Sequence, residues 1–213
     1  MQAATPIDGI FYVIILIMSV VIHEFAHGYS AYLLGDNTAR LSGRLTLNPL
    51  KHLDPFGSFI LPLLLIISKA GFVIGWARPV PYNPNNLKSG RRGTFIVSIS
   101  GILANISIAI IFGLLIRFAP ALGLPSYSQA LPFYRITTTI VFTNLVLALF
   151  NIIPIPPLDG SKILFSILPH SFRFIEDFLE QWGMFILLFF IIFLWSTFSP
   201  IIYIAFTFIT GIA

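Results

Sequence analysis

The sequence predicts an all-α polytopic membrane protein with about four to six membrane segments and a short strand-like or re-entrant element after the first one. The first observation is composition: of 213 residues, 57% are hydrophobic and 9% are charged. A soluble domain carries about 25% charged residues, so this chain cannot cover itself with a hydrated surface. The second is that apolar stretches recur along the chain, with a mean hydropathy of +0.93. The length suits one compact unit, 1–213, without a separate soluble domain.

Five apolar stretches approach the length of about 20 residues that a membrane helix needs. The first lacks a basic region before it and runs too far to be a signal peptide. The last is long enough for one tilted span, which Pro200 is expected to kink or divide. Before it, residues 160–180 are expected to form a short amphipathic helix beside the membrane. The five stretches are roughly 9–34, 57–75, 94–118, 136–156 and 181–212.

The loops that flank the second stretch bear on its course. Residues 39–47 alternate between polar and apolar like a strand, whereas 76–93 read as an irregular loop. The two loops, 35–56 and 76–93, both carry Lys and Arg, which favours the cytoplasmic side, yet a full span between them would place them on opposite sides. We therefore expect 57–75 to enter the bilayer and return, with a full span as the open alternative. The net charge of +4 lies in short loops and indicates topology, not a nucleic-acid partner.

The first apolar stretch contains the pattern HEFAH at residues 23–27. In a helix, positions i and i+4 share one face, so His23 and His27 can direct ring nitrogens at one zinc ion. Glu24 lies about 100° round the helix, where it can reach a zinc-bound water as a general base. The alternative is a buried polar cluster that ties helices together. Charged groups at mid-membrane cost about 2.5–3.5 kcal/mol each, and interhelical hydrogen bonds hardly offset three of them.

A catalytic zinc site needs a third protein ligand and one open position. The chain has no cysteine, so this ligand must be His, Asp or Glu. Asp159 follows the stretch NIIPIPPL at the end of an apolar segment that is expected to run parallel to the first. From spacing alone, Asp159 is equally well explained as the N-cap of a helix beginning at Gly160. His52, in the loop after the first segment, is the rival ligand.

These motifs together resemble the site-2 protease family of intramembrane zinc metalloproteases. The resemblance rests on HEFAH, on SGILAN at 100–105 and on NIIPIPPLDG at 151–160, and covers roughly residues 20–165. The stretches GRLTLNPLKHLDPFGS and GWARPVPYNP are similar to the compact prokaryotic branch that lacks PDZ and CBS domains. The third-helix motif usually has Pro after its Gly, whereas here Gly101 is followed by Ile102. This departure does not touch the expected chemistry.

The resemblance implies a single transmembrane metalloprotease domain over 1–213, with a catalytic core at about 9–165 and C-terminal membrane segments at 181–212. It implies one Zn²⁺ ion bound by His23, His27 and Asp159, with Glu24 as general base. The expected activity is endoproteolysis of transmembrane helices in membrane-protein substrates. The expected location is a prokaryotic cell membrane, with the active site near the cytoplasmic side. The alternatives are a metal-ion or proton transporter that uses the same residues, and a catalytically idle relative that binds membrane helices.

Three further features are expected to support the site. Asn105 is an amide inside an apolar helix, where we favour a tie between helices over a substrate contact. Asn151 begins the Asn-x-x-Pro motif and is expected to bind the extended substrate backbone or to orient a ligand. The strand-like residues 39–47 can add to an unwound substrate by edge pairing, with a small structural hairpin as the equal alternative.

Overall fold

The computed structural model describes residues 6–60, 64, 67–68, 77–124 and 130–212. Four of the described helical segments are long and apolar enough to cross a membrane: 9–33, 90–118, 131–151 and 173–198. No strand occurs within the described ranges. The prediction of a polytopic all-α membrane protein is therefore confirmed.

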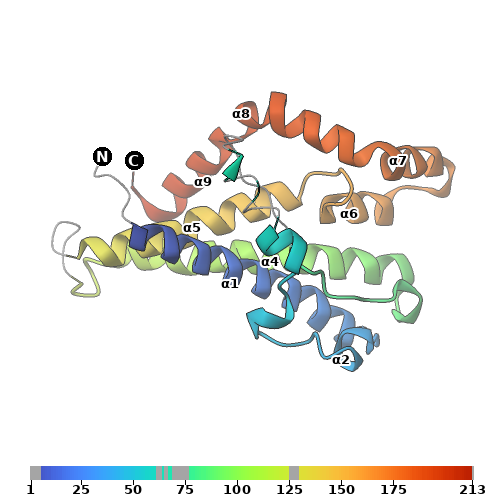
Figure 1. The fold of residues 1–213 in the computed structure, drawn as a ribbon, viewed down its shortest axis with the longest axis horizontal. Helices are drawn as coiled ribbons and strands as arrows, with labels where there is room; N and C mark the ends of the chain where they lie inside the picture. The colour runs from blue at the N-terminus through green and yellow to red at the C-terminus, as the bar shows by residue number, and fades with distance from the viewer. Residues whose placement is uncertain (1–5, 61–63, 65–66, 69–76, 125–129, 213) are drawn as a thin grey trace.

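Three long helices form the centre of the molecule (Figure 1). They are α1 (Pro6–Leu33), α4 (Gly90–Phe118) and α5 (Leu131–Asn151). Helices α1 and α5 run in the same direction, while α4 runs antiparallel and packs against both. Buried apolar side chains join α4 and α5 to the C-terminal helix, among them Ala109, Val141 and Ile202. The C-terminal ends of α1 and α5 therefore lie at the same end of the core, as the sequence predicts.

The break after α5 positions the next helix. The predicted segment 136–156 ends as a helix at Asn151, because prolines at 154, 156 and 157 cannot continue the hydrogen-bonding pattern. Helix α6 (Asp159–Ile167) then packs against α4. A Cβ on Gly160 would collide with the backbone of Ile152 and Ile153, so only glycine permits this approach.

The C-terminal region folds back along the core (Figure 1). A 3₁₀ turn (His170–Phe172) leads into α7 (Arg173–Phe189), which continues through a π-helical turn (Phe190–Leu194) and α8 (Trp195–Phe198). Helix α9 (Pro200–Thr210) begins at the proline, so Pro200 divides the last apolar stretch as predicted. The single amphipathic helix expected over 160–180 is wrong, because its first half is α6 and its second half already belongs to the fourth span.

The region between α1 and α4 departs from the strand-like prediction for 39–47. Residues 38–41 form a single helical turn, α2 (Thr38–Leu41), and Gly43 turns the chain with a φ of 67°. The cause is local: the Asp36 carboxylate accepts hydrogen bonds from Thr38 N and Oγ1, which nucleates a turn. Residues 39–47 therefore form no strand or hairpin that could pair with substrate. Short helical turns follow at Pro49–Lys51 and Pro55–Ile60. Most of 57–75 lies outside the described residues, and its course stays a prediction.

An extended segment, residues 77–83, lies along the C-terminal half of α1; we call it the strap. It is held at Arg78, whose N–H donates to His52 O at 2.8 Å, and at Asn83, whose N–H donates to Asp36 Oδ2 at 2.7 Å. A 3₁₀ turn (Pro84–Asn86) and a hydrogen bond from Lys88 N to Leu34 O then lead into α4. The strap thereby lies against the side of α1 that carries Glu24 and Gly28.

Candidate metal centre

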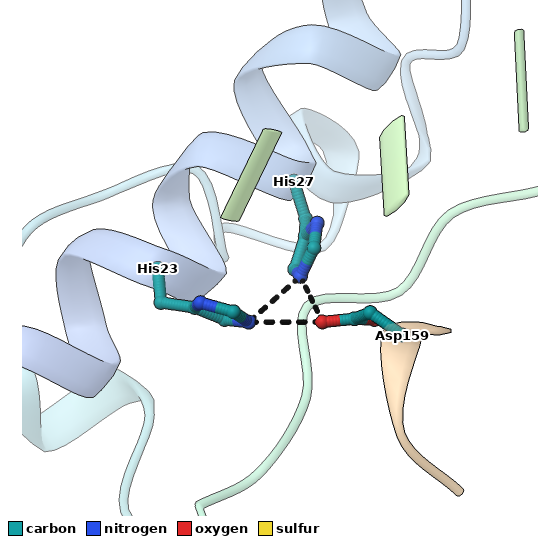
Figure 2. A group of neighbouring side chains, drawn as sticks. All are labelled: His23, His27 and Asp159. Atoms are coloured by element: carbon teal, nitrogen blue, oxygen red, sulfur yellow. Dashed lines mark hydrogen bonds and ion pairs between the residues drawn. The ribbon is translucent and has the colours of Figure 1, made fainter. Parts of the chain in front are cut away.

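His23 and His27 project from one face of α1 toward Asp159 at the start of α6 (Figure 2). The two Nε2 atoms lie 3.0 Å apart, and Asp159 Oδ2 lies 3.0 Å from that of His23 and 2.9 Å from that of His27. All three residues are at least 90% buried. Within the described ranges, no other group of three or more His, Asp and Glu side chains converges in this way. The i, i+4 spacing accounts for the histidine pair, and the break before α6 brings in the carboxylate.

The partners of the two Nδ1 atoms determine which ring nitrogen faces the group. His27 Nδ1 lies 2.7 Å from the carbonyl oxygen of Val97, which can only accept, so this nitrogen carries the proton. His23 Nδ1 lies 2.6 Å from Asn105 Oδ1 and likewise donates. Neutral imidazoles in this arrangement direct bare Nε2 lone pairs at each other and at a carboxylate oxygen. Such a convergence of three acceptors is stabilised by a cation at its centre.

The geometry fits zinc. With separations of 2.9–3.0 Å, each ligand atom lies about 1.7 Å from the centre of the triangle. A point about 1.0–1.2 Å out of that plane is therefore about 2.0–2.1 Å from all three, which is the usual bond length of zinc to His nitrogen and carboxylate oxygen. Two imidazoles and one carboxylate are a known ligand set of catalytic zinc, and a fourth position stays open for water.

Gly101 on α4 leaves the space in which the ligand atoms meet. A Cβ at this position would lie 2.6 Å from His27 Nε2 and 2.7 Å from both Cε1 and Nε2 of His23. Any side chain would therefore press on the converging ring atoms of both histidines. Asn105 lies one helical turn later on the same face of α4. The stretch SGILAN thus supplies an open space beside both histidines and a hydrogen-bond acceptor to His23.

Asp159 uses its two oxygens differently. Oδ2 faces the histidines, whereas Oδ1 lies 3.3 Å from Lys162 Nζ, one turn along α6. The N-cap position of α6 is Leu158, so the alternative in which Asp159 caps this helix is wrong. The lysine holds the carboxylate so that a single oxygen is presented to the group.

Glu24 lies beside the group and contacts the strap. Its Oε2 accepts a hydrogen bond from Val80 N at 2.8 Å. Pro79 and Pro81 have no N–H, so Val80 supplies the one backbone donor of this tripeptide. The Val80 side chain is buried against Gly28, whose added Cβ would lie 2.7 Å from Val80 Cγ1. The Glu24 carboxylate is thus held by the N–H of Val80, and the Val80 side chain is in turn fixed against Gly28, one turn further along α1.

The chain is similar to known proteins over most of its length. The sequence model of Peptidase family M50 matches residues 125–194. The chain is 43% identical over 180 residues to "Putative zinc metalloprotease YwhC" of Bacillus subtilis, covering 83% of this chain and 77% of that protein. The chain belongs to peptidase family M50, the site-2 protease family.

More distant M50 relatives match over a similar part of the chain. "Putative zinc metalloprotease Rip2" of Mycolicibacterium smegmatis is 33% identical over 181 residues, which cover 84% of this chain and 66% of the relative. The protein of the same name from Mycobacterium tuberculosis is 29% identical over 158 residues, which cover 73% of this chain and 57% of the relative. The chain thus spans less than two thirds of these longer proteins. No solved structure matches it.

The other residues singled out in this M50 chain take different positions. Asn105 is fully buried between His23 and Asn144, so it forms the interhelical tie; its substrate contact stays a prediction. Asn151 is half-buried and donates to Leu147 O within α5, and its contact with substrate also stays a prediction. His52 is buried with Nε2 on Thr46 O at 2.8 Å and does not join the group, so the rival-ligand alternative is wrong.

Sequence reasoning missed two polar residues behind the site, Ser19 and Asn144. Asn144 donates to Ser19 Oγ at 3.0 Å and accepts from Asn105 Nδ2 at 2.7 Å. The available signal was an amide at residue 144 inside an apolar helix, the same signal that singled out Asn105. Ser19 lies one turn before His23 on α1, where the HEFAH pattern gives no reason to look.

Proposed function

We propose that this chain is an intramembrane zinc endopeptidase that cleaves transmembrane helices of membrane-protein substrates. The convergence of His23, His27 and Asp159 with their lone pairs facing one another carries the proposal. Membership of a peptidase family and relatives named as zinc metalloproteases support both the activity and the metal. Residues 1–213 then form a single domain with a catalytic core at about 9–165.

The proposed chemistry uses Glu24 as general base. Zinc, when bound, lowers the pKa of a water molecule toward 7 and polarises the scissile carbonyl. Glu24 accepts a proton from the attacking water and later delivers it to the leaving amine. The Val80 N–H occupies one lone pair of Oε2 and fixes the carboxylate, while the remaining lone pairs are free to accept the proton.

The depth of the site supports a substrate within the membrane. His27 lies six residues before the end of α1 at Leu33, which corresponds to about 9 Å along the helix. A helical substrate has its carbonyls hydrogen-bonded, so a segment must unwind before a peptide bond can enter the site. Basic residues gather in the loops at this end of α1, namely Arg40, Arg44, Lys51, Arg78 and Lys88. This distribution favours a cytoplasmic-side active site in a cell membrane.

The test of the mechanism is Glu24→Gln. The amide keeps the size of the side chain and cannot take a proton, so zinc content should stay at one ion per chain. Cleavage of a model transmembrane substrate in detergent or liposomes should fall by a factor of about 10²–10⁴. Turnover equal to that of the unaltered chain would eliminate Glu24 as general base.

Metal analysis tests the ligand set separately. Asp159→Ala removes one of three protein ligands and should lower zinc content of the purified protein, whereas His52→Ala should leave it unchanged. Vesicle assays on the unaltered chain address the transporter alternative. Zinc flux without proteolysis would replace the proposed activity with transport.

A further inference from the structure

A row of buried polar side chains lies directly behind His23. It joins three helices: Ser19 on α1, Asn105 on α4 and Asn144 on α5. Both asparagines are fully buried, and Ser19 is 4% exposed. Hydrogen bonds between helices in lipid contribute little to stability on average. Helix association alone is therefore a weak reason to bury two amides in an apolar core.

The direction of each hydrogen bond in this row follows from one backbone carbonyl. Ile140 O can only accept, and it lies 2.9 Å from the Asn144 side chain, so the NH₂ group of Asn144 must face it. The same NH₂ group donates to Ser19 Oγ at 3.0 Å. Asn144 Oδ1 therefore points the other way, toward Asn105, and must receive a proton.

The next link transmits this orientation to the metal centre. Asn105 Nδ2 lies 2.7 Å from Asn144 Oδ1 and donates to it, with a second, longer contact of 3.4 Å to Ser19 O. The remaining atom, Asn105 Oδ1, faces His23 Nδ1 at 2.6 Å and accepts its proton. With the proton on Nδ1, the Nε2 lone pair of His23 is free for a metal.

The reverse orientation shows what the row prevents. If Asn105 turned by 180° about its last bond, an NH₂ group would face His23 Nδ1. That nitrogen would then become the acceptor, the ring proton would move to Nε2, and the ligand atom would be blocked. His27 needs no such row, because a backbone carbonyl, Val97 O, binds its Nδ1 directly.

We infer that Asn144 is a positioning residue which, held by Ile140 O and Ser19 and acting through Asn105, fixes His23 in the tautomer that binds metal. The hydrogen-bond partners of Asn144 are Ile140, Ser19 and Asn105, none of which carries a proposed ligand atom. Its effect on the site is carried by the orientation of one amide. The inference rests on the proposed role of His23 as a zinc ligand. Mutation of residues that orient a metal ligand without binding the metal typically changes metal affinity by about 10- to 100-fold.

The test compares Asn144→Leu with Asn144→Asp in the full chain. Leucine keeps the size but gives Asn105 no acceptor, so Asn105 is free to turn. In its protonated form, aspartate donates its O–H to Ile140 O and keeps the other oxygen facing Asn105 Nδ2, so the orientation of Asn105 is preserved. Thr143→Val is the matched control, because Thr143 is buried on the same helix and its Oγ1 has no hydrogen-bond partner within the described residues.

Two measurements are made on each variant. The zinc Kd is measured by chelator competition, and the tautomer of His23 is read in the metal-free protein by ¹⁵N NMR of labelled histidine. We expect Asn144→Leu to weaken zinc binding by about 10- to 100-fold and to populate the form protonated at Nε2. Asn144→Asp and Thr143→Val should match the unaltered chain in both measurements.

The outcomes separate the inference from the proposed function. If the unaltered chain binds no zinc, the proposed function itself fails. If it binds zinc and Asn144→Leu keeps the same Kd and the same tautomer, Asn144 is only a tie between helices and the inference is overturned. If Asn144→Leu does not fold, Asn144→Asp decides alone. A folded Asn144→Asp protein with a changed tautomer at His23 would contradict the inference.

Discussion

Replacing Gly101 by alanine should weaken zinc binding without dismantling the fold. The added Cβ would lie 2.6–2.7 Å from three ring atoms of His23 and His27, whereas ordinary contacts begin at 3.4 Å. The rings would thus have to withdraw by about 0.7–0.8 Å, yet each is held at its far side by a hydrogen bond of 2.6 or 2.7 Å. Overpacking of this kind costs about 1–3 kcal/mol.

Because the strain falls on the metal-facing atoms, we expect it to appear in metal affinity. At 1.4 kcal/mol per factor of ten, the zinc Kd should rise by about 5- to 150-fold. The assay is chelator competition with purified Gly101→Ala protein, accompanied by thermal unfolding in the same detergent. Proteolysis of a model substrate should fall in parallel at limiting zinc and recover in part when zinc is added.

Gly113→Ala provides the control. Gly113 lies three turns further along α4 than Gly101. A Cβ added to Gly113 would collide with Ile209 Cγ2 on α9, and no atom of His23 or His27 is among its nearest neighbours. It should lower the unfolding temperature and leave the zinc Kd unchanged. An unchanged Kd in Gly101→Ala would refute the reasoning that this glycine reserves space for the metal.

Two other substitutions test the contacts of the strap. Val80→Pro removes the N–H that binds Glu24 and should lower kcat about tenfold with KM and zinc Kd unchanged. Val80→Ala keeps the N–H and should retain kcat. Equal kcat in the two variants would count against a role of the Val80 N–H in holding Glu24. Asp36 accepts hydrogen bonds from Thr38, Asn86 and Asn83, which outweigh its burial and lower its pKa. The unfolded state therefore binds the proton more tightly, so the stability that Asp36 contributes is present above its unfolded pKa of about 3.9 and is lost as the pH falls through the folded value. Asp36→Asn should lower the free energy of unfolding by about 1–3 kcal/mol at pH 7. The decline of this free energy below pH 4 should also become less steep in the variant. A decline as steep as that of the unaltered chain would show that other acidic groups cause the loss of stability at low pH.

The sequence was sufficient for the elements whose signal is local. Apolar length predicted the helices α1, α4 and α5, and the spacing of HEFAH predicted that His23 and His27 share a face. Pro200 marked the division of the last stretch because a proline cannot donate the hydrogen bond that a helix interior needs. The parallel course of α1 and α5 followed from the distribution of basic residues, although it was reached through a region, 57–75, that lies largely outside the described structure.

What the sequence could not supply depends on contacts between distant segments. The alternation in 39–47 looked like a strand, but the carboxylate of Asp36 binds Thr38 and turns the chain. The contact between Val80 and Glu24 joins residues 56 positions apart, and no local pattern indicates it. Asn144 was not identified from the sequence for the same reason, because its proposed positioning role depends on its contact with Asn105 in the folded chain.

The distance in sequence between the two halves of the centre has a consequence for biosynthesis. His23 and Asp159 are 136 residues apart, and α6 can dock only after α4 and α5 are in place. A chain emerging from the ribosome with α1 already inserted has two histidines and no carboxylate, so it holds metal poorly. Because N-terminal parts of a chain are made and generally fold first, the proposed hydrolytic activity would arise only once the core helices have assembled. Under the proposed function, a chain that stops in the bilayer before α6 is made would lack its third metal ligand and could not cleave neighbouring membrane proteins.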